Sequence, residues 1–403
     1  MTVNSDARAV NAEPIGADAS SRGARLRRVV LAATIGNTLD WYDFLIYGFL
    51  AGTIAKLFFP TESELASLLL SVATFGVGAV VRPIGALVLG IYSDRVGRKA
   101  ALTLTIFLMA LGTGLIAVAP TYASIGIWAP LLVVMSRLLQ GFSCGGELGG
   151  ATAILVENAP EGRRGLYASW QTASQAAGLL LGAMMTTLVS LSMTPAQFEA
   201  GGWRWLFAIG LIIVPVGFYI RSKLDEPEVF LKARKDAAVF SFTETVRDQY
   251  RPLITGTGVA VLYAASAYVL FIYMPTFAVR QLGLPFSQAL IATTAAGCVV
   301  FVGSPVLAAI SDRYGRKPLL LVGALAFALL TYPAFAAISV QPSLAKLAAV
   351  QLVFGLAMAA YAGPAISVYA EYFQPACARP RCRWCTISRS QWSADLHPSS
   401  LPG

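Results

Sequence analysis

The sequence predicts an all-α polytopic membrane protein. Hydrophobic residues make up 56% of its 403 residues and charged residues only 13%, whereas about a quarter of an average soluble chain is charged. Apolar runs long enough to cross ~30 Å of hydrocarbon, which takes about 20 helical residues, recur along the chain. Because whole turns lack polar residues, the runs indicate helices and not the alternating strands of a barrel.

Ten membrane-spanning helices are expected, each a continuous apolar run bounded by polar or basic residues. The first six are expected at 30–52, 66–91, 101–119, 126–156, 166–190 and 205–221. Four more are expected at 253–279, 288–310, 318–338 and 347–371. The expected organisation is an N-terminal tail (1–29), a six-helix bundle (30–221), a linker (222–252), an incomplete bundle of four helices (253–373) and a non-membrane tail (374–403).

Basic residues indicate the orientation. They gather in the N-terminal tail and in the loops after the second, fourth, sixth and eighth spans, whereas the opposite loops hold only Lys56, Arg204, Arg280 and Lys346. This bias predicts a cytoplasmic N-terminus. It also explains the pI of about 9.4, so no nucleic-acid partner is predicted. The first 29 residues contain no apolar segment, so no cleaved signal peptide is expected.

The chain repeats itself. The segment GIYSDRVGRK (90–99) recurs as AAISDRYGRK (308–317), an offset of 218 residues. A second echo pairs Gly141 with Gly355, and Glu157 with Glu371, at an offset of 214 residues. Two similar bundles in tandem, with a site between them near the membrane midplane, are typical of secondary transporters.

Five further segments give the sequence a family resemblance. They are GNTLDWYDFLIYG, RPIGALVLG, RLLQGFSCGGELGG, GWRWLF and DEPEVF. With the SDRxGRK loops, they make the chain from about residue 28 to 373 resemble the metabolite:proton symporters of the major facilitator superfamily. The resemblance implies twelve spans in two bundles and uptake of a small hydrophilic metabolite, driven by the proton gradient without a cofactor. It implies substrates such as carboxylates or zwitterionic osmolytes, for example betaine and proline.

The resemblance ends at Phe373. The last thirty residues, from Gln374, hold three of the five cysteines and the only histidine, and no run there could span a bilayer. We expect a reading-frame shift near codon 374 that replaced the last two spans. The alternative is a metal-binding tail with Cys377, Cys382, Cys385 and His397. Their spacings match no zinc pattern beyond one CxxC, so no metal site is predicted.

Two aspartates interrupt the first span. Asp40 and Asp43 are three residues apart, so they share a helix face with Gly36 and Tyr47. Charged groups at membrane depth cost about 2.5 to 3.5 kcal/mol and normally face the bundle interior. Because two close negative charges repel, we expect one aspartate to hold a proton at neutral pH and to act as a proton carrier. The alternative is that either aspartate pairs with an arginine to fix packing.

Two arginines are candidates for substrate binding. Arg82 lies in the second span, and Arg137 begins a stripe in the fourth span that continues through Gln140, Cys144 and Glu147. A guanidinium binds a carboxylate by two hydrogen bonds and stays charged, so both arginines suit an anionic substrate. Glu147 joins the aspartates as a candidate for proton coupling. The alternative is that each arginine forms a structural ion pair with a carboxylate in the spans.

Other polar side chains complete the predicted site. Amides and phenols can bind the oxygens of a polar metabolite, so Tyr47, Gln171, Gln175 and Tyr263 are predicted substrate contacts. Interfacial anchoring is the alternative for aromatic residues near helix ends. Gly141, Gly145 and Gly149 recur at four-residue spacing, which predicts close approach of a neighbouring helix. Cys144 and Cys298 lie inside spans and predict no disulfide.

The repeated loops are predicted gating elements. Gly90 is expected to allow close helix approach, Asp94 to face the start of the third span, and the basic residues to hold the loop inside. The resemblance implies that such loops latch the cytoplasmic side. The predicted gating residues are Gly90, Asp94, Arg95, Arg98, Asp312, Arg313 and Arg316. The alternative is a purely topological anchor.

The predicted function is proton-coupled symport of a small hydrophilic metabolite. A carboxylate is favoured because of the two arginines. No ATP-binding GxxxxGK[ST] and no HExxH motif occurs in the sequence, so neither a primary pump nor an enzyme is predicted. The expected partners are the substrate, protons and the lipid bilayer around a monomer. Two alternatives stay open: a non-transporting remnant, and a membrane sensor, for which polar segments of about 30 residues are short.

Overall fold

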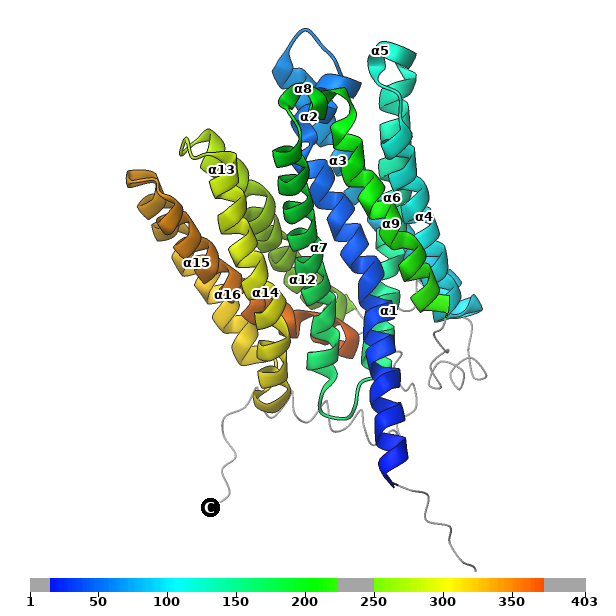
Figure 1. The fold of residues 1–403 in the computed structure, drawn as a ribbon. Coiled ribbons are helices and arrows are strands. Elements are labelled where there is room, and N and C mark those ends of the chain that lie inside the picture. Colours follow the sequence, from blue (N-terminus) through cyan, green and yellow to red (C-terminus); the bar gives the residue numbers. More distant parts are fainter. Residues whose placement is uncertain (1–14, 223–249, 373–403) are drawn as a thin grey trace, which may run out of the picture.

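The computed structural model describes residues 15–222 and 250–372, which form helices joined by short turns (Figure 1). The first part contains α1 (Ile15–Phe49), α2 (Ala51–Phe58), α3 (Glu64–Val96), α4 (Arg98–Val118), α5 (Tyr122–Ile125), α6 (Trp128–Glu157), α7 (Arg164–Ser192), α8 (Pro195–Gln197), the π-helical turn η1 (Phe198–Gly202) and α9 (Trp203–Ser222). The second part contains α12 (Tyr250–Tyr268), the π-helical turn η2 (Val269–Tyr273), α13 (Met274–Arg280), α14 (Phe286–Tyr314), α15 (Lys317–Val340) and α16 (Leu344–Tyr372). Each expected span corresponds to one long helix or, for 253–279, to α12 through α13. The tail 374–403 and most of the linker 222–252 lie outside the described residues.

Eight helical segments within the described residues are long and apolar enough to cross a membrane. The helices α1 and α6 are equally long but fall outside this set, and they contain the buried charged residues Asp40, Asp43, Arg137 and Glu147. Large apolar side chains cover the outside of the bundle; Val80, for example, is 74% exposed. Extended apolar surface is rare on soluble monomers, so this exterior is suited to lipid.

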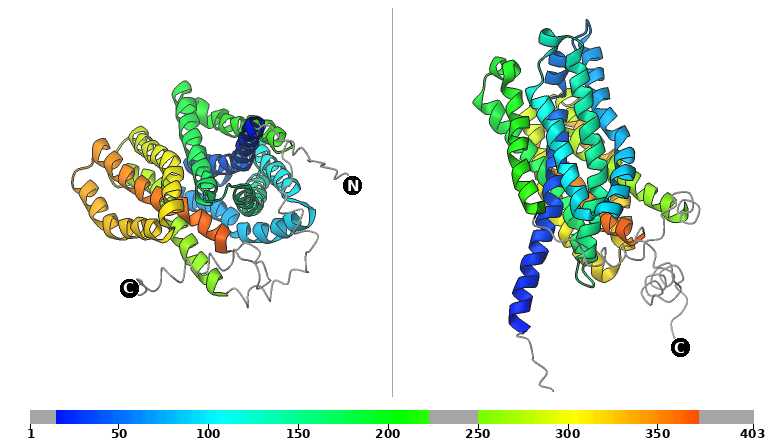
Figure 2. Two further views of the ribbon diagram at one scale, coloured as in Figure 1. Left: turned by 90° about the horizontal axis from the view of Figure 1, so that it is seen from below. Right: turned by 90° about the vertical axis from the view of Figure 1, so that its right-hand side faces the viewer.

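The long helices run alternately up and down the bundle (Figure 1). The lower end, as we name it below, is the end where α1, α4 and α7 begin and where α3 and α14 finish. Figure 2 shows two groups of helices, a first group from α1 to α9 and a second group from α12 to α16. The groups meet where α7 packs against α14 and α16. One apolar cluster crosses this junction, with Phe44 and Leu179 from the first group and Leu270 and Phe354 from the second.

The turns after α3 and α14 are built alike. Each SDRxG segment places its glycine at positive φ, +136° at Gly97 and +91° at Gly315, which is costly for any residue with a Cβ. The next helix begins almost at once, at Arg98 after α3 and at Lys317 after α14. The backbone geometry therefore explains why this glycine recurs in both copies of the motif.

Glycines bring α3 and α6 into backbone contact. A Cβ at Gly141 would overlap the Gly78 carbonyl, and one at Gly145 would overlap another carbonyl of α3. The close approach expected at these two positions is confirmed. The same expectation is wrong at Gly149 and Gly90, where a Cβ would meet nothing within 4 Å. At both positions the space beside the glycine is open, so neither glycine makes a close contact with a neighbouring helix.

Candidate functional site

The polar stripe of α1 is buried inside the first group. Asp40 and Asp43 are 4% and 3% exposed, and Tyr47 lies one turn further along the same helix with its ring fully buried. Gly36, one turn before Asp40, leaves room for the ends of two side chains of α6 and α9, which a Cβ there would displace. The inward-facing stripe predicted from the sequence is therefore confirmed.

Asp43 is partly hydrogen-bonded. The Thr113 hydroxyl of α4 donates to its Oδ2 atom, and Gln140 Nε2 of α6 lies 3.4 Å from the same atom. Gln140 Nε2 also donates to Thr113 Oγ1 at 3.0 Å, while Oδ1 of Asp43 is buried without a partner. Sequence reasoning missed Thr113, because a single threonine in an apolar run carries no distinctive signal.

Among the described residues, Asp40 receives no hydrogen bond from a nitrogen or oxygen donor, although the Cys144 thiol lies beside it. Both of its carboxylate oxygens are buried without a partner among the described residues. The charges that act on it belong to Glu147, Arg221, Arg82 and Asp43. A buried carboxylate that receives no hydrogen bond is costly when ionised. Asp40 thus has two oxygens free to accept a donor or a proton, whereas Asp43 has one.

Arg82 and Arg137 lie over aromatic rings. The Arg82 guanidinium is 4.9 Å from the Phe44 ring centroid, and the Arg137 guanidinium is 4.0 Å from that of Tyr47. Cation–π contact of this kind stabilises a guanidinium by about 0.5 to 2 kcal/mol. Nε of Arg82, and Nε and Nη2 of Arg137, are buried without hydrogen-bond partners. These N–H groups are thus oriented by stacking and still able to donate.

A small cavity connects these groups. Its volume is about 20 Å³, and its wall includes Asp40, Arg82, Arg137, Gln140 and Cys144. A volume of about 10 to 15 Å³ suffices for one water molecule, so a metabolite of several heavy atoms needs this space to widen. The stripe of α6 predicted from the sequence, from Arg137 to Cys144, forms one side of the cavity.

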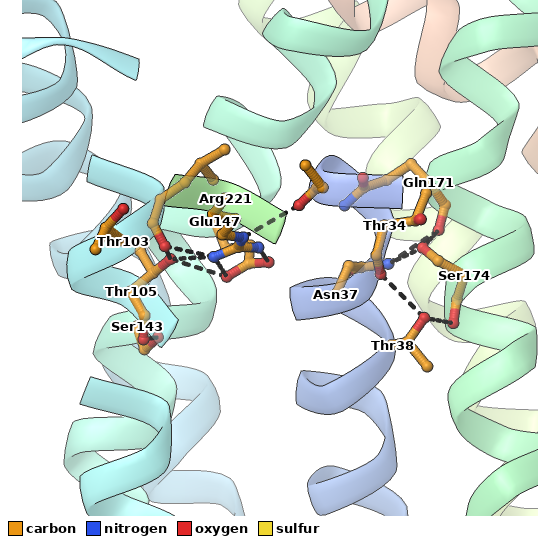
Figure 3. Close-up of polar contacts among 12 residues, drawn as sticks. Thr34, Asn37, Thr38, Thr103, Thr105, Ser143, Glu147, Gln171, Ser174 and Arg221 are labelled. Atoms are coloured by element: carbon orange, nitrogen blue, oxygen red, sulfur yellow. Dashed lines mark hydrogen bonds and ion pairs between the residues drawn. The ribbon is translucent and has the colours of Figure 1, made fainter. Parts of the chain in front are cut away.

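Glu147 forms a buried ion pair that the sequence did not predict (Figure 3). Arg221 Nη2, at the end of α9, donates to Glu147 Oε1, and the two side chains are 0% and 1% exposed. Thr105 donates to Glu147 Oε2 at 2.9 Å, and Arg221 Nε donates to the Ala32 carbonyl at 3.1 Å. Arg221 thereby connects α1, α4, α6 and α9. Arg221 lies beside a basic linker, so from the sequence it looked like one of the basic residues that fix membrane orientation.

The predicted contacts on α7 lie at the junction of the two groups. Tyr263 of α12 donates to Gln175 Oε1, which is a hydrogen bond across the junction. The side chain of Gln171 is fully buried, and neither of its amide atoms has a hydrogen-bond partner. Asn37 of α1, also missed from the sequence, donates to the Gln171 carbonyl at 3.0 Å and to Ser174 Oγ at 2.6 Å (Figure 3).

The second group caps a helix of the first group at the lower end. The two carboxylate oxygens of Asp312 accept hydrogen bonds from the backbone N–H groups of Gly165 and Leu166, both at 2.9 Å. These N–H groups belong to the first turn of α7, where an anionic acceptor is most favourable. Arg316 lies 2.6 Å from Asp312 and holds the carboxylate in place. We name this set of contacts the α7 latch.

The other predicted gating residues differ in their surroundings. Arg98 lies 3.6 Å from Glu157, so it joins the ends of α3, α4 and α6 within the first group. Arg95 and Arg313 are exposed, as expected of residues that anchor a loop outside the bilayer. The side chain of Asp94 lies outside the described residues. The predicted role of the first loop in gating therefore stays a prediction.

No group of three or more His, Cys, Asp or Glu residues in the described ranges could hold a metal ion. The candidate ligands in the tail, Cys377, Cys382, Cys385 and His397, lie outside those ranges. Cys144 and Cys298 are both free. The cavity is lined by two cationic groups, Arg82 and Arg137, and one acidic group, Asp40, while Asp43 is buried one turn further along α1.

Two groups of membrane-spanning helices with a charged, buried cavity define a polytopic transporter. The model of the Major Facilitator Superfamily matches residues 31–379, and the chain belongs to this family. The chain is 38% identical over 370 residues to the citrate-proton symporter of Klebsiella pneumoniae, a match that covers 92% of this chain and 83% of the relative. It is 34% identical to the proline/betaine transporter of Escherichia coli (strain K12), covering 77% of this chain and 64% of the relative.

A solved structure supports the fold. The partially occluded, inward-open xylose transporter XylE from E. coli superposes with a TM-score of 0.66 and covers 87% of this chain and 89% of its own, at 20% identity. The all-α major facilitator fold expected from the sequence is therefore confirmed. The resemblance inferred from the motifs is confirmed as well, and the chain is a transporter and not an enzyme.

Proposed function

We propose that this chain couples the downhill entry of protons to the uptake of a small carboxylate by alternating access. The observation that carries the proposal is the pair Arg82 and Arg137, whose buried N–H groups lack hydrogen-bond partners beside two buried aspartates. A guanidinium matches a carboxylate by two parallel hydrogen bonds. A relative at 38% identity that is named a citrate-proton symporter supports the same substrate class.

The charges of the cavity explain why proton and substrate would move together. Arg82, Arg137 and Asp40 line the cavity and Asp43 is buried one turn from Asp40, so two arginines and two ionised aspartates cancel formally in this part of the bundle. An entering carboxylate adds a negative charge, and a proton on Asp40 or Asp43 compensates for it. Because an uncompensated charge in a buried site is costly, each ligand favours the binding of the other. Asp40 is the better acceptor because it has two oxygens free to accept a proton, whereas Asp43 has one.

Alternating access would occur by rocking of the two groups about the cavity. We assign the lower end to the cytoplasm, because α3 and α14 finish there (Figure 1) and their last turns contain the exposed residues Arg95 and Arg313. The α7 latch then closes the cytoplasmic side, and its release opens a path into the cell. The proposed carrier is a monomer in a bacterial inner membrane and uses the proton gradient as its energy source without a cofactor.

A zwitterionic osmolyte is the second candidate, because relatives named proline/betaine transporters are 34% identical. A quaternary ammonium group is usually recognised by the open faces of aromatic rings. At this site the guanidinium groups of Arg82 and Arg137 already lie over the rings of Phe44 and Tyr47, so these ring faces are not open to an ammonium group. This arrangement favours a carboxylate over a betaine.

Uptake into proteoliposomes tests the proposal. The purified chain is reconstituted, an inward proton gradient is imposed, and radiolabelled citrate, succinate, proline and glycine betaine are offered. We expect gradient-dependent uptake of a carboxylate that is abolished by a protonophore. Arg137→Gln should abolish it, whereas Arg280→Gln, a change at an exposed arginine at the end of α13, should not. Uptake of the zwitterions alone, or uptake indifferent to the gradient, would refute the proposal.

A further inference from the structure

One close glycine contact of the first group recurs at the matching position of the second group. In the first group, Gly141 of α6 packs against the Gly78 carbonyl of α3. In the second group, Gly355 of α16 packs against the Ala296 carbonyl of α14, with its Cβ direction 3.1 Å from that oxygen. The offsets between these pairs are 218 and 214 residues, the same offsets that link the sequence echoes. Helix α14 is therefore the counterpart of α3, and α16 of α6.

The counterpart of Arg137 at the offset of 214 is Gln351. Arg137 lines the charged cavity, and Gln351 occupies the matching position on α16. Its side chain is fully buried, and its Nε2 atom donates to Thr293 Oγ1 of α14 at 3.0 Å. The cationic position of the first group is therefore occupied by a neutral amide in the second.

The hydrogen bonds of Thr293 determine how this amide is oriented. The Thr293 hydroxyl donates its only hydrogen to the Ala289 carbonyl at 2.9 Å. Its oxygen can then only accept, so the atom of Gln351 that faces it must be the N–H₂ group. The Oε1 atom of Gln351 is left as a buried acceptor without a partner. An acceptor in this condition costs about 1 to 3 kcal/mol unless a donor reaches it.

One apolar cluster links the charged cavity to the neighbours of Gln351. Phe44 forms part of the cavity wall and belongs to the same apolar cluster as Leu347 and Phe354. These two residues lie one turn before and one turn after Gln351 on α16. The residues that line the cavity all belong to the first group, and we expect the cavity to extend along this cluster to Gln351 Oε1 when the two groups rock.

We propose that Gln351, oriented by Thr293, is the contact that the second group makes with the substrate, and that its Oε1 atom accepts a hydrogen bond from a hydroxyl group of the transported carboxylate. The inference rests on the proposed function and adds specificity to it. An ionised carboxylate has no hydrogen to donate to Oε1. Gln351 would therefore distinguish substrates by their hydroxyl group, whereas the arginines bind their carboxylate group. A hydroxyl needs a single neutral acceptor, whereas an ammonium group needs several acceptors or a counter-charge. The predicted substrates are therefore hydroxycarboxylates.

The test compares pairs of carboxylates that differ by one hydroxyl group. Gradient-driven uptake of citrate is compared with that of tricarballylate, and uptake of malate with that of succinate. We expect the wild-type chain to prefer the hydroxylated member of a pair by about 10- to 100-fold in kcat/KM, in line with the cost of leaving one buried acceptor without a donor. Gln351→Leu should reduce this ratio to about one, mainly by slowing the hydroxylated substrate. Thr293→Val should reduce the ratio partly, and Thr293→Ser should retain it.

The ratio is independent of how much variant protein folds, because both substrates are measured on the same vesicles. Ser367→Ala is the matched control, since Ser367 is a buried polar residue of α16 whose hydroxyl bonds within its own helix to the Pro364 carbonyl at 2.7 Å. It should leave the ratio unchanged. An unchanged ratio in Gln351→Leu, or equal loss of both substrates, would overturn the inference and leave carboxylate uptake standing. Wild-type uptake of none of the four acids would overturn both proposals.

Discussion

Asp312 supplies a helix cap that α7 cannot make for itself. The N-cap position of α7 is Arg163, which makes no side-chain capping hydrogen bond. Both capping bonds come instead from the Asp312 carboxylate in the other group of helices. Asp312→Asn keeps the size of the side chain but leaves one acceptor oxygen and no charge. We therefore expect this change to favour states in which the lower end is open.

The size of the effect follows from these contacts. A hydrogen bond to a charged group contributes about 1.5 to 3 kcal/mol, and replacing a capping residue costs about 0.5 to 2 kcal/mol. The Asp312 contacts are only partly buried, so we take the lower part of this range, about 1 to 2 kcal/mol. A change of that size alters the ratio of two states by about 5- to 30-fold. The open population should thus rise from minor to substantial.

Distance measurements between spin labels can detect this shift. Labels are placed at Glu161 and Lys317, which are exposed at the lower end on the two sides of the α7 latch, in a background without native cysteines. Asp312→Asn should add a population at longer distance. Lys56→Gln, which breaks an exposed ion pair with Glu199, should not. If the distance distribution of Asp312→Asn matches that of the parent, the latch does not control opening.

Three further predictions concern coupling, stability and packing. Asp43→Asn should abolish proton-driven uptake in a correctly inserted protein, and an unaltered dependence of uptake on pH would remove Asp43 from the mechanism. Glu147→Gln leaves a buried guanidinium without a counter-charge and should lower the free energy of unfolding by about 3 to 5 kcal/mol. Lys56→Gln should change it by less than about 1 kcal/mol, so a similar thermal shift in both would argue against a structural ion pair. Gly141→Ala should destabilise by about 1 to 3 kcal/mol through overpacking against α3, whereas Gly149→Ala, which meets open space, should not reduce the unfolding temperature.

The spans and the buried stripe could be predicted because each leaves a strong pattern. A long apolar run has few alternatives to a membrane helix. A charge within such a run must face the interior, so Asp40, Asp43, Arg82 and Arg137 could be brought together by reasoning alone. Asp40, Asp43 and Arg137 are buried as this reasoning requires, and Asp40, Arg82 and Arg137 line one cavity. What sequence reasoning did not give was the pairing among them.

The pairings depend on how each helix is rotated about its axis and how far it is shifted along the membrane normal. The spacing of residues within one helix does not reveal either quantity. Glu147 lies on the same stripe as Arg137 but pairs with Arg221 of a helix far away in sequence. Thr113 and Gln351 are single polar residues in apolar runs and are common in helices with no function. Gly90 was instead predicted where nothing was found: it was expected to pack closely against a helix, but the space in its Cβ direction is open. Small residues indicate a possible contact but not its direction.

The matched contacts of Gly141 and Gly355 have a consequence for engineering the carrier. The two halves have kept the close backbone approach of their helices, while the side chain one turn earlier has become a cation in one half and an amide in the other. The groups proposed for energy coupling all belong to the first half. Substrate range could therefore be redesigned at Gln351 and its neighbours without rebuilding the coupling machinery, which a symmetric carrier with charges in both halves would not permit.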